Sequence, residues 1–234
     1  MKRTLIVLLA LAVLCLVAGI GLAAVANTPH DIRNGSADQI CAFCHTPHQG
    51  SSSGYPLWNR TQTAPTYTMY TSATFDMGPA AATPGFPSAA CLTCHNGVAS
   101  TLVNYPGPGS LGDTNYNFTM GNATNYAIWA NVGADLRNDH PVSFTYNPAQ
   151  DNQANGFPNA SGGRILNLYQ LYGSAVPGNQ MECATCHAVH DTATYTKNPW
   201  SVTSKTHTGT TGEVYFLRTT NVASRMCNDC HVNR

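Results

Sequence analysis

The sequence predicts a chain that is mostly coil, with a few short helices and minimal strand. Lys, Arg, Asp and Glu make up only 9% of the 234 residues, against about a quarter in an ordinary globular domain. Gly and Pro contribute 20 and 14 residues, which favours turns over regular elements. After residue 26 no long stretch repeats apolar residues at the spacing of an amphipathic helix. Nine Cys and nine His are the unusual part of the composition, and the interpretation depends on them.

The charge balance excludes one class of partner. The formal net charge is zero, and a nucleic-acid-binding surface requires a basic excess. We therefore expect no nucleic acid partner. Ordinary disorder is also disfavoured, because it combines low hydrophobicity with high net charge.

The amino terminus has the features of a secretory signal peptide over residues 1–26. Lys2 and Arg3 precede an apolar run that ends at Ala24-Val25-Ala26, a small-x-small cleavage site. The run is also long enough to serve as a retained membrane anchor, which is the alternative. Cys15 lies inside the run and is lost on cleavage. The mature chain would then be exported, would have no stable membrane span, and would keep eight cysteines in an oxidising setting.

These eight cysteines form four Cys-x-x-Cys-His motifs. The motifs are Cys41/Cys44/His45, Cys91/Cys94/His95, Cys183/Cys186/His187 and Cys227/Cys230/His231. In a helical turn, positions i, i+3 and i+4 lie on one face. Two thiols on that face can form thioether bonds to one haem, and the following imidazole can bind its iron as the proximal ligand. The sequence therefore predicts four covalent haem c groups, and the fold class of a multihaem c-type cytochrome wrapped around a stack of four haems.

Other uses of paired cysteines explain the motifs less well. Four disulfides would leave the four histidines without a role, and zinc sites more often combine Cys pairs with separately spaced His pairs. Thioredoxin-like redox pairs occur singly within a βαβ pattern, which this chain lacks.

Five further histidines are candidates for the distal faces of the haems. They are His30, His48, His140, His190 and His207. His48 and His190 each follow a proximal histidine by three residues, and three extended residues span at most roughly 11 Å. That is too short to pass around the rim of the same haem. Each is therefore a ligand of a neighbouring haem or a surface residue beside one.

The order of motifs repeats, which suggests two di-haem modules. Each half contains a leading histidine, then Cys-x-x-Cys-His-x-x-His, then Cys-x-x-Cys-His. We place the first module at 27–125 and the second at 126–234, within one continuous haem-core domain. His30 and His140 are the leading distal ligands. His207 has no counterpart and lies in a Ser/Thr/Gly stretch, 204–212, which we expect to be a solvated loop.

Several segments around the motifs resemble a known family. They are Ile40–His48 with the sequence ICAFCHTPH, Pro56-Leu57-Trp58-Asn59-Arg60, Asp139–Tyr146 with DHPVSFTY, and Tyr215-Phe216-Leu217-Arg218. Together they are similar to subunits of extracellular tetrahaem c-type cytochrome filaments (nanowires) of the OmcE type. The resemblance implies bis-His haems in a continuous stack, with distal ligands at His30, His48, His140 and His190. It also implies identical subunits joined head-to-tail, one distal histidine donated across the interface, and long-range electron transfer outside the cell.

His30 would be the fourth residue of the mature chain, on an arm that could reach its own body or a neighbour's. The function that we expect is electron transfer in such a filament, at the cell surface or beyond, with redox proteins or extracellular acceptors as partners. A monomeric periplasmic electron shuttle and a membrane-anchored quinol dehydrogenase are alternatives. No catalytic motif stands out, so we do not expect an enzyme.

Overall fold

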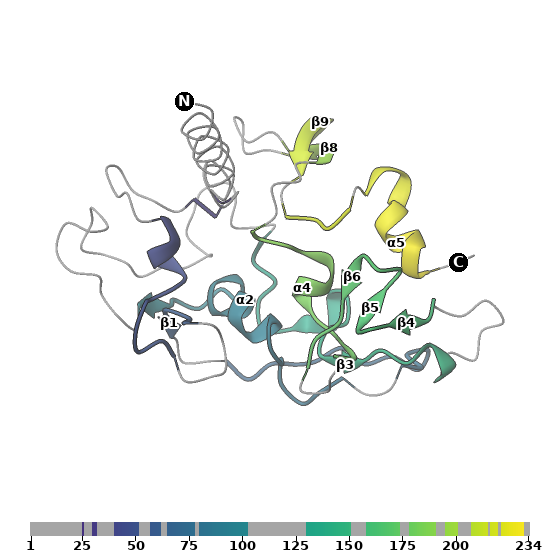
Figure 1. Ribbon diagram of the computed structural model, residues 1–234, viewed down its shortest axis with the longest axis horizontal. Helices are drawn as coiled ribbons and strands as arrows, with labels where there is room; N and C mark the ends of the chain where they lie inside the picture. Colours follow the sequence, from purple (N-terminus) through teal and green to yellow (C-terminus); the bar gives the residue numbers. More distant parts are fainter. Residues whose placement is uncertain are drawn as a thin grey trace, which may run out of the picture.

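The computed structural model describes residues 25, 30–31, 40–51, 57–61, 65–77, 80–102, 130–150, 158–173, 178–190, 195–200, 207–214, 216–219 and 221–231. Apart from Val25, the predicted signal peptide lies outside these residues. Residues 103–129, around the boundary between the two predicted modules, also lie outside them. Over the described residues the chain is mostly coil and turn, as the sequence predicts, and its regular elements are short (Figure 1).

The helical elements are single turns or little more. They are η2 (Ile40–Phe43), α2 (Ser88–His95), η3 (Leu136–Asn138), η4 (Pro148–Gln150), α4 (Cys183–Cys186), η5 (Val222–Ser224) and α5 (Arg225–Cys230), where η marks a 3-10 helix. The longest of these, α2, has eight residues. It ends before Gly97, whose φ of 77° is in the left-handed region that favours glycine after a helix.

The strands form small antiparallel pairs. The strands are β1 (Arg60–Thr61), β2 (Thr101–Leu102), β3 (Phe144–Thr145), β4 (Ala160–Ser161), β5 (Arg164–Ile165), β6 (Tyr169–Gln170), β7 (Gln180–Met181), β8 (Tyr195–Trp200) and β9 (His207–Val214). β1 pairs with β2, β3 with β7, and β8 with β9, while β4, β5 and β6 form a three-stranded sheet. The turn between β4 and β5 is Gly162-Gly163, with φ of 58° and 74°, the positive values that a tight two-residue hairpin requires.

Two sequence-based expectations about strands have different outcomes. Val142–Tyr146 alternates apolar and polar residues, a pattern that predicts a short strand, and β3 lies within it. The solvated loop expected over 204–212 is wrong from residue 207 onward, because β9 begins at His207, which pairs in register with Trp200. The stretch contains several Thr residues, and β-branched side chains favour extended backbone.

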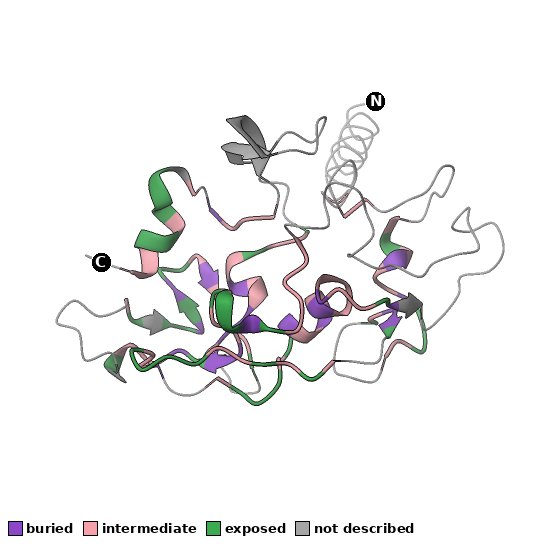
Figure 2. Cartoon of the chain, turned by 180° about the vertical axis from the view of Figure 1, so that it is seen from behind, coloured by how far each residue is buried: buried purple, intermediate pink, exposed green. Residues whose placement is uncertain are grey.

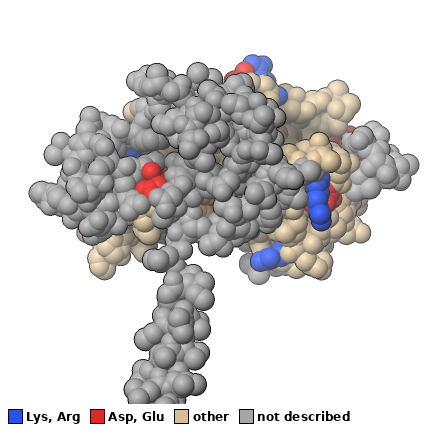
Figure 3. Space-filling view, turned by 90° about the horizontal axis from the view of Figure 1, so that it is seen from above, with Lys and Arg blue, Asp and Glu red and all other residues tan. Residues whose placement is uncertain are grey.

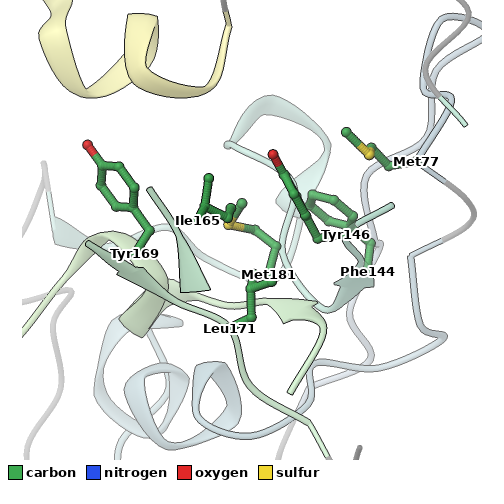
Figure 4. Packing of buried hydrophobic residues seen from close by; sticks show 7 residues of the cluster. All are labelled: Met77, Phe144, Tyr146, Ile165, Tyr169, Leu171 and Met181. Carbon is green, nitrogen blue, oxygen red and sulfur yellow. The ribbon is translucent and has the colours of Figure 1, made fainter. Parts of the chain in front are cut away.

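The apolar core lies beside the small sheets of the second half of the chain. Its members are Met77, Phe144, Tyr146, Ile165, Tyr169, Leu171 and Met181, each at most 5% exposed (Figure 4). Met226 and Cys230 of α5 pack against this cluster. Figure 2 shows that buried residues are concentrated in the short central elements, whereas α5 is exposed or intermediate.

A buried polar cluster joins the two halves of the chain. Glu182, 1% exposed, accepts hydrogen bonds at Oε2 from Ser88 Oγ (2.5 Å) and Ser143 Oγ (2.9 Å). Ser88 Oγ also accepts from the backbone N–H of Cys183 at 2.9 Å. The start of α2 is therefore tied to the start of α4, so the second and third Cys-x-x-Cys-His motifs are held together across the predicted module boundary.

Charged side chains are sparse over the surface that the structure describes (Figure 3). One exposed ion pair joins Arg137 to Asp135, with 2.7 Å between Nη2 and Oδ2. None of the helices formed by the described residues is long and apolar enough to cross a membrane.

Candidate haem-binding sites

All four Cys-x-x-Cys-His motifs fold into a helical turn. The backbone N–H of the motif histidine bonds to the carbonyl of the first cysteine in three of them: His45 to Cys41 (2.8 Å), His187 to Cys183 (3.0 Å) and His231 to Cys227 (2.7 Å). The motif at 91–95 occupies the second half of α2. Each turn therefore has the geometry that brings two thiols and one imidazole to a common face.

The attachment thiols of successive motifs lie near one another. All eight are free cysteines. The neighbouring Cys183 thiol, together with desolvation, raises the pKa of Cys91 well above its usual value. Desolvation, reinforced by Cys94, raises the pKa of Cys44 to about 11, so the first motif faces the second.

The third and fourth motifs face each other in the same way. Desolvation, reinforced by Cys183 and Cys227, raises the pKa of Cys186 to about 11. Desolvation and the neighbouring Cys186 raise the pKa of Cys230 to about 12. The four attachment sites thus follow one another in chain order, and α2, α4 and α5 are spread along the long axis of the molecule in that order (Figure 1).

Three of the four proximal histidines lie opposite a predicted distal histidine. The ring centroids of His45 and His190 are 5.9 Å apart, and those of His95 and His30 are 6.0 Å apart. The rings of His231 and His140 are separated by 6.3 Å.

These ring separations fit two imidazoles on opposite faces of one haem iron. A metal–imidazole bond is about 2.0 Å long, and the centre of a five-membered ring lies roughly 1.1 Å from its nitrogen. Two axial rings on one iron therefore have centres about 6 Å apart. The described residues contain no group of three or more His, Cys, Asp or Glu side chains suited to a bare metal ion. A bis-His haem iron needs only two protein ligands.

Hydrogen bonds to two of these rings fix their orientation. Nδ1 of His95 is 2.7 Å from the carbonyl oxygen of Ala130, and Nδ1 of His140 is 2.9 Å from that of Pro141. When the N–H is at Nδ1, it donates to the carbonyl and Nε2 keeps its lone pair for a metal. Metal-binding histidines commonly have such a second partner, so these residues fit a haem ligand.

The environment of His30 also favours the neutral imidazole that a metal requires. Desolvation, together with the nearby His95, His187 and His190, lowers the pKa of His30 to about 4. Phe216 stacks on the His30 ring, with centroids 4.4 Å apart and planes 17° apart. His30 is therefore placed among histidines of its own chain.

Two of the eight predicted iron ligands, His48 and His187, are not placed by a ring contact of this kind. His48 is exposed at a bend after the first motif, where its carbonyl accepts from Thr46 Oγ1 at 2.9 Å. Ring contacts among the described residues assign no distal partner to His187. His48 and His187 are not part of the three ring pairs above.

A short backbone segment holds the first motif through an isolated antiparallel bridge. Residues 57–60, which we name the first clamp, run antiparallel to the motif, with Trp58 opposite His45. Thr46 N–H donates to the Leu57 carbonyl (2.8 Å), and Asn59 N–H donates to the Cys44 carbonyl (2.8 Å).

A second clamp, residues 216–219, holds the third motif with the same register. Leu217 lies opposite His187. Ala188 N–H donates to the Phe216 carbonyl (2.7 Å), and Arg218 N–H donates to the Cys186 carbonyl (2.9 Å). Each clamp begins at a residue with positive φ: Leu57 at 55° and Phe216 at 67°.

Clamp side chains also bond to the residues between the two cysteines. Asn59 Nδ2 donates to the Ala42 carbonyl (2.9 Å) and Arg60 Nε to the Phe43 carbonyl (2.7 Å). In the second clamp, Arg218 Nε donates to the Ala184 carbonyl at 2.8 Å. The two clamps therefore bind the first and third motifs, which are the two motifs with a second histidine three residues further on.

Sequence reasoning did not identify the clamps or the Glu182 cluster as parts of the site. The only signal was the pair of segments noted for their resemblance, Pro56–Arg60 and Tyr215–Arg218, whose role no spacing rule predicts. The Glu182 cluster gave no sequence signal, because its serines are ordinary turn residues in isolation.

In comparisons with known proteins, no protein-family model and no curated protein sequence matched this chain.

Proposed function

We propose that the protein transfers electrons through four covalently bound bis-His haems, as a subunit of a polymeric extracellular cytochrome filament. The observation that carries the proposal is the set of four Cys-x-x-Cys-His turns. Each turn is folded so that its thiols and imidazole share a face, and three of the four face a second histidine at about 6 Å. A bound haem iron supplies a reversible one-electron carrier.

The chain's own residues hold the haems in two ways. The cysteines of each motif would attach one haem, and three ring pairs would supply the histidine ligands of three of the irons: His45 with His190, His95 with His30, and His231 with His140. The first pair joins residues from opposite halves of the chain. His190 therefore serves the haem of another motif, as the short spacing from His187 requires.

The proximity of the thiols supports transfer from haem to haem. Neighbouring attachment points would bring the edges of neighbouring macrocycles close, and the thiols of Cys91 and Cys183 are near enough to shift the pKa of one another. Two axial histidines on an iron leave no open position for a substrate, which supports electron carriage rather than catalysis.

One observation favours the monomeric periplasmic shuttle as a second candidate. His30 lies beside His95 of its own chain, so the same ligand can close the second haem without a neighbour. In the filament, His30 would instead come from the adjacent subunit. The two candidates share all haem chemistry and differ only in the source of this ligand.

The test is expression of the full chain with a cytochrome c maturation system, followed by haem-stained denaturing gels and intact mass. We expect four haems per chain and a fully low-spin electron paramagnetic resonance spectrum. A Cys41→Ser/Cys44→Ser variant is the matched control and should carry three haems. A wild-type mass with fewer than four haems would overturn the proposal.

Negative-stain microscopy separates the two candidates. Filaments in the secreted fraction that are lost in His30→Ala, with one haem turned high-spin, would support the filament. Single particles of wild-type protein with four low-spin haems would favour the shuttle.

A further inference from the structure

We propose that Arg60 and Arg218 are positioning residues whose positive charges raise the reduction potentials of the haems attached at the first and third motifs. The same argument gives the haem at the fourth motif a lower potential, because Asp229 lies there instead. This inference rests on the proposed function, since it requires attached haems.

Arg60 is buried beside two attachment sites. It is 2% exposed, and its Nε donates to the Phe43 carbonyl inside the first Cys-x-x-Cys turn. Its cation lies close enough to Cys44 and Cys94 to interact with both side chains. The cation is therefore next to the first site and near the second.

At the third motif the cation comes from Arg218, at the clamp position that Asn59 occupies in the first clamp, one residue before the position of Arg60. Its Nε donates to the Ala184 carbonyl, and its Nη2 donates to Tyr172 Oη at 3.0 Å. Its charge acts on Cys186, the second attachment cysteine, as the charge of Arg60 acts on Cys44. Each clamp thus places a cation against the Cys-x-x-Cys turn that it holds, although the two arginines occupy neighbouring rather than equivalent clamp positions.

The fourth motif carries the opposite charge. Asp229 lies between its two cysteines and accepts a hydrogen bond from Tyr169 Oη at 2.5 Å. Its carboxylate lies close enough to interact with the neighbouring Cys230 side chain. An anion therefore stands at the edge of this haem site.

The sign of the effect follows from the charge of the iron. The oxidised haem carries one more positive charge than the reduced haem. A fixed cation beside the macrocycle therefore destabilises the oxidised form and raises the potential, while an anion lowers it. Such effects are strong where protein replaces water, and salt screens them little.

Arginine suits this position better than lysine. Its guanidinium stays charged even when burial lowers its pKa. Its fork of N–H donors allows one group to bond the turn while the charge is delocalised over the rest. The same side chain can therefore hold the Cys-x-x-Cys turn and supply the charge.

The test compares Arg60→Gln and Arg218→Gln with Arg137→Gln, which removes an exposed cation paired with Asp135. Each holoprotein is first shown by mass and spin state to carry four low-spin haems, and its four midpoints are then measured by spectroelectrochemical titration. We expect a downward shift of one midpoint for Arg60→Gln and for Arg218→Gln, and none for Arg137→Gln. Arg60→Lys keeps the charge and should stay near the wild type.

The outcomes distinguish this inference from the proposed function. Four low-spin haems with unchanged midpoints in both Gln variants would overturn the inference and leave the function intact. A downward shift of the midpoint in Arg60→Lys as large as that in Arg60→Gln would also overturn the inference, because charge would then not be the cause. If the Gln variants do not accumulate, Asp229→Asn decides: an upward shift of one midpoint supports the inference, and no shift refutes it.

Discussion

Replacing Ser88 by alanine tests the polar cluster that joins the second and third haem motifs. Ser88 is fully buried. Its hydroxyl donates to Glu182 Oε2 at 2.5 Å and accepts from Cys183 N–H at 2.9 Å. Alanine fits the same space and removes both bonds, so the change isolates the hydroxyl.

The size of the loss follows from the two partners. A hydrogen bond to a charged group contributes about 1.5–3 kcal/mol, and a buried backbone N–H left without a partner costs about 1–3 kcal/mol. Ser143 still donates to Glu182 Oε2, which keeps the carboxylate partly satisfied. We therefore expect Ser88→Ala to lower the free energy of unfolding by about 3 kcal/mol.

The loss should depend on pH. Burial raises the pKa of Glu182, and the bonds from Ser88 and Ser143 oppose that rise. Without Ser88, the pKa in the folded state rises further. A raised carboxyl pKa means stability that is present below the ordinary value of 4.5 and is lost as pH rises through the folded value. The difference between Ser88→Ala and wild type should therefore be larger at neutral pH than in acid.

The assay is guanidinium unfolding of the holoprotein, followed by circular dichroism at neutral and acidic pH. Ser72→Ala is the control, because Ser72 is exposed and its hydroxyl bonds only locally to Thr74; it should change stability by less than about 0.5 kcal/mol. In Ser88→Ala/Glu182→Gln the losses should not add, since the two groups are in contact. A loss no greater than that of Ser72→Ala, or one that is independent of pH, would refute the reasoning.

Three further predictions concern single side chains. His190→Ala should turn one of the four haems high-spin in electron paramagnetic resonance, namely the haem of the first motif rather than that of His187; a fully low-spin spectrum would contradict the ring pairing. Tyr169→Phe keeps the buried ring but removes the hydrogen bond to Asp229, and should lower the free energy of unfolding by about 1.5–3 kcal/mol. An unchanged denaturant concentration at the unfolding midpoint would show that the bond contributes nothing. His207→Ala should leave all four haems low-spin, and any high-spin signal would make this residue a ligand.

Local features of the chain could be predicted from the sequence. The Cys-x-x-Cys-His spacing predicts a helical turn, and the turns at His45, His187 and His231 close through bonds to residues four positions earlier. The scarcity of apolar periodicity predicts coil, and the described elements are correspondingly short. Gly162-Gly163 predicts a tight turn, because few other residues adopt positive φ twice in succession.

The tertiary structure decided which distant residues meet. Nothing in the sequence pairs His190 with His45 rather than with another motif, because the choice depends on how the two halves cross. Arg60 and Arg218 look like ordinary surface charges in a polar stretch, yet Arg60 is buried and both bond to haem-attachment turns.

His207 shows the same limit for secondary structure. Its Ser/Thr/Gly neighbours are typical of a loop, but pairing with β8 provides the backbone partners that make 207–214 a strand. Sequence spacing determines contacts within one turn, where the backbone itself sets the distances. Contacts between turns depend on the packing of the whole chain, because burial and long-range hydrogen bonds exist only once the segments have come together.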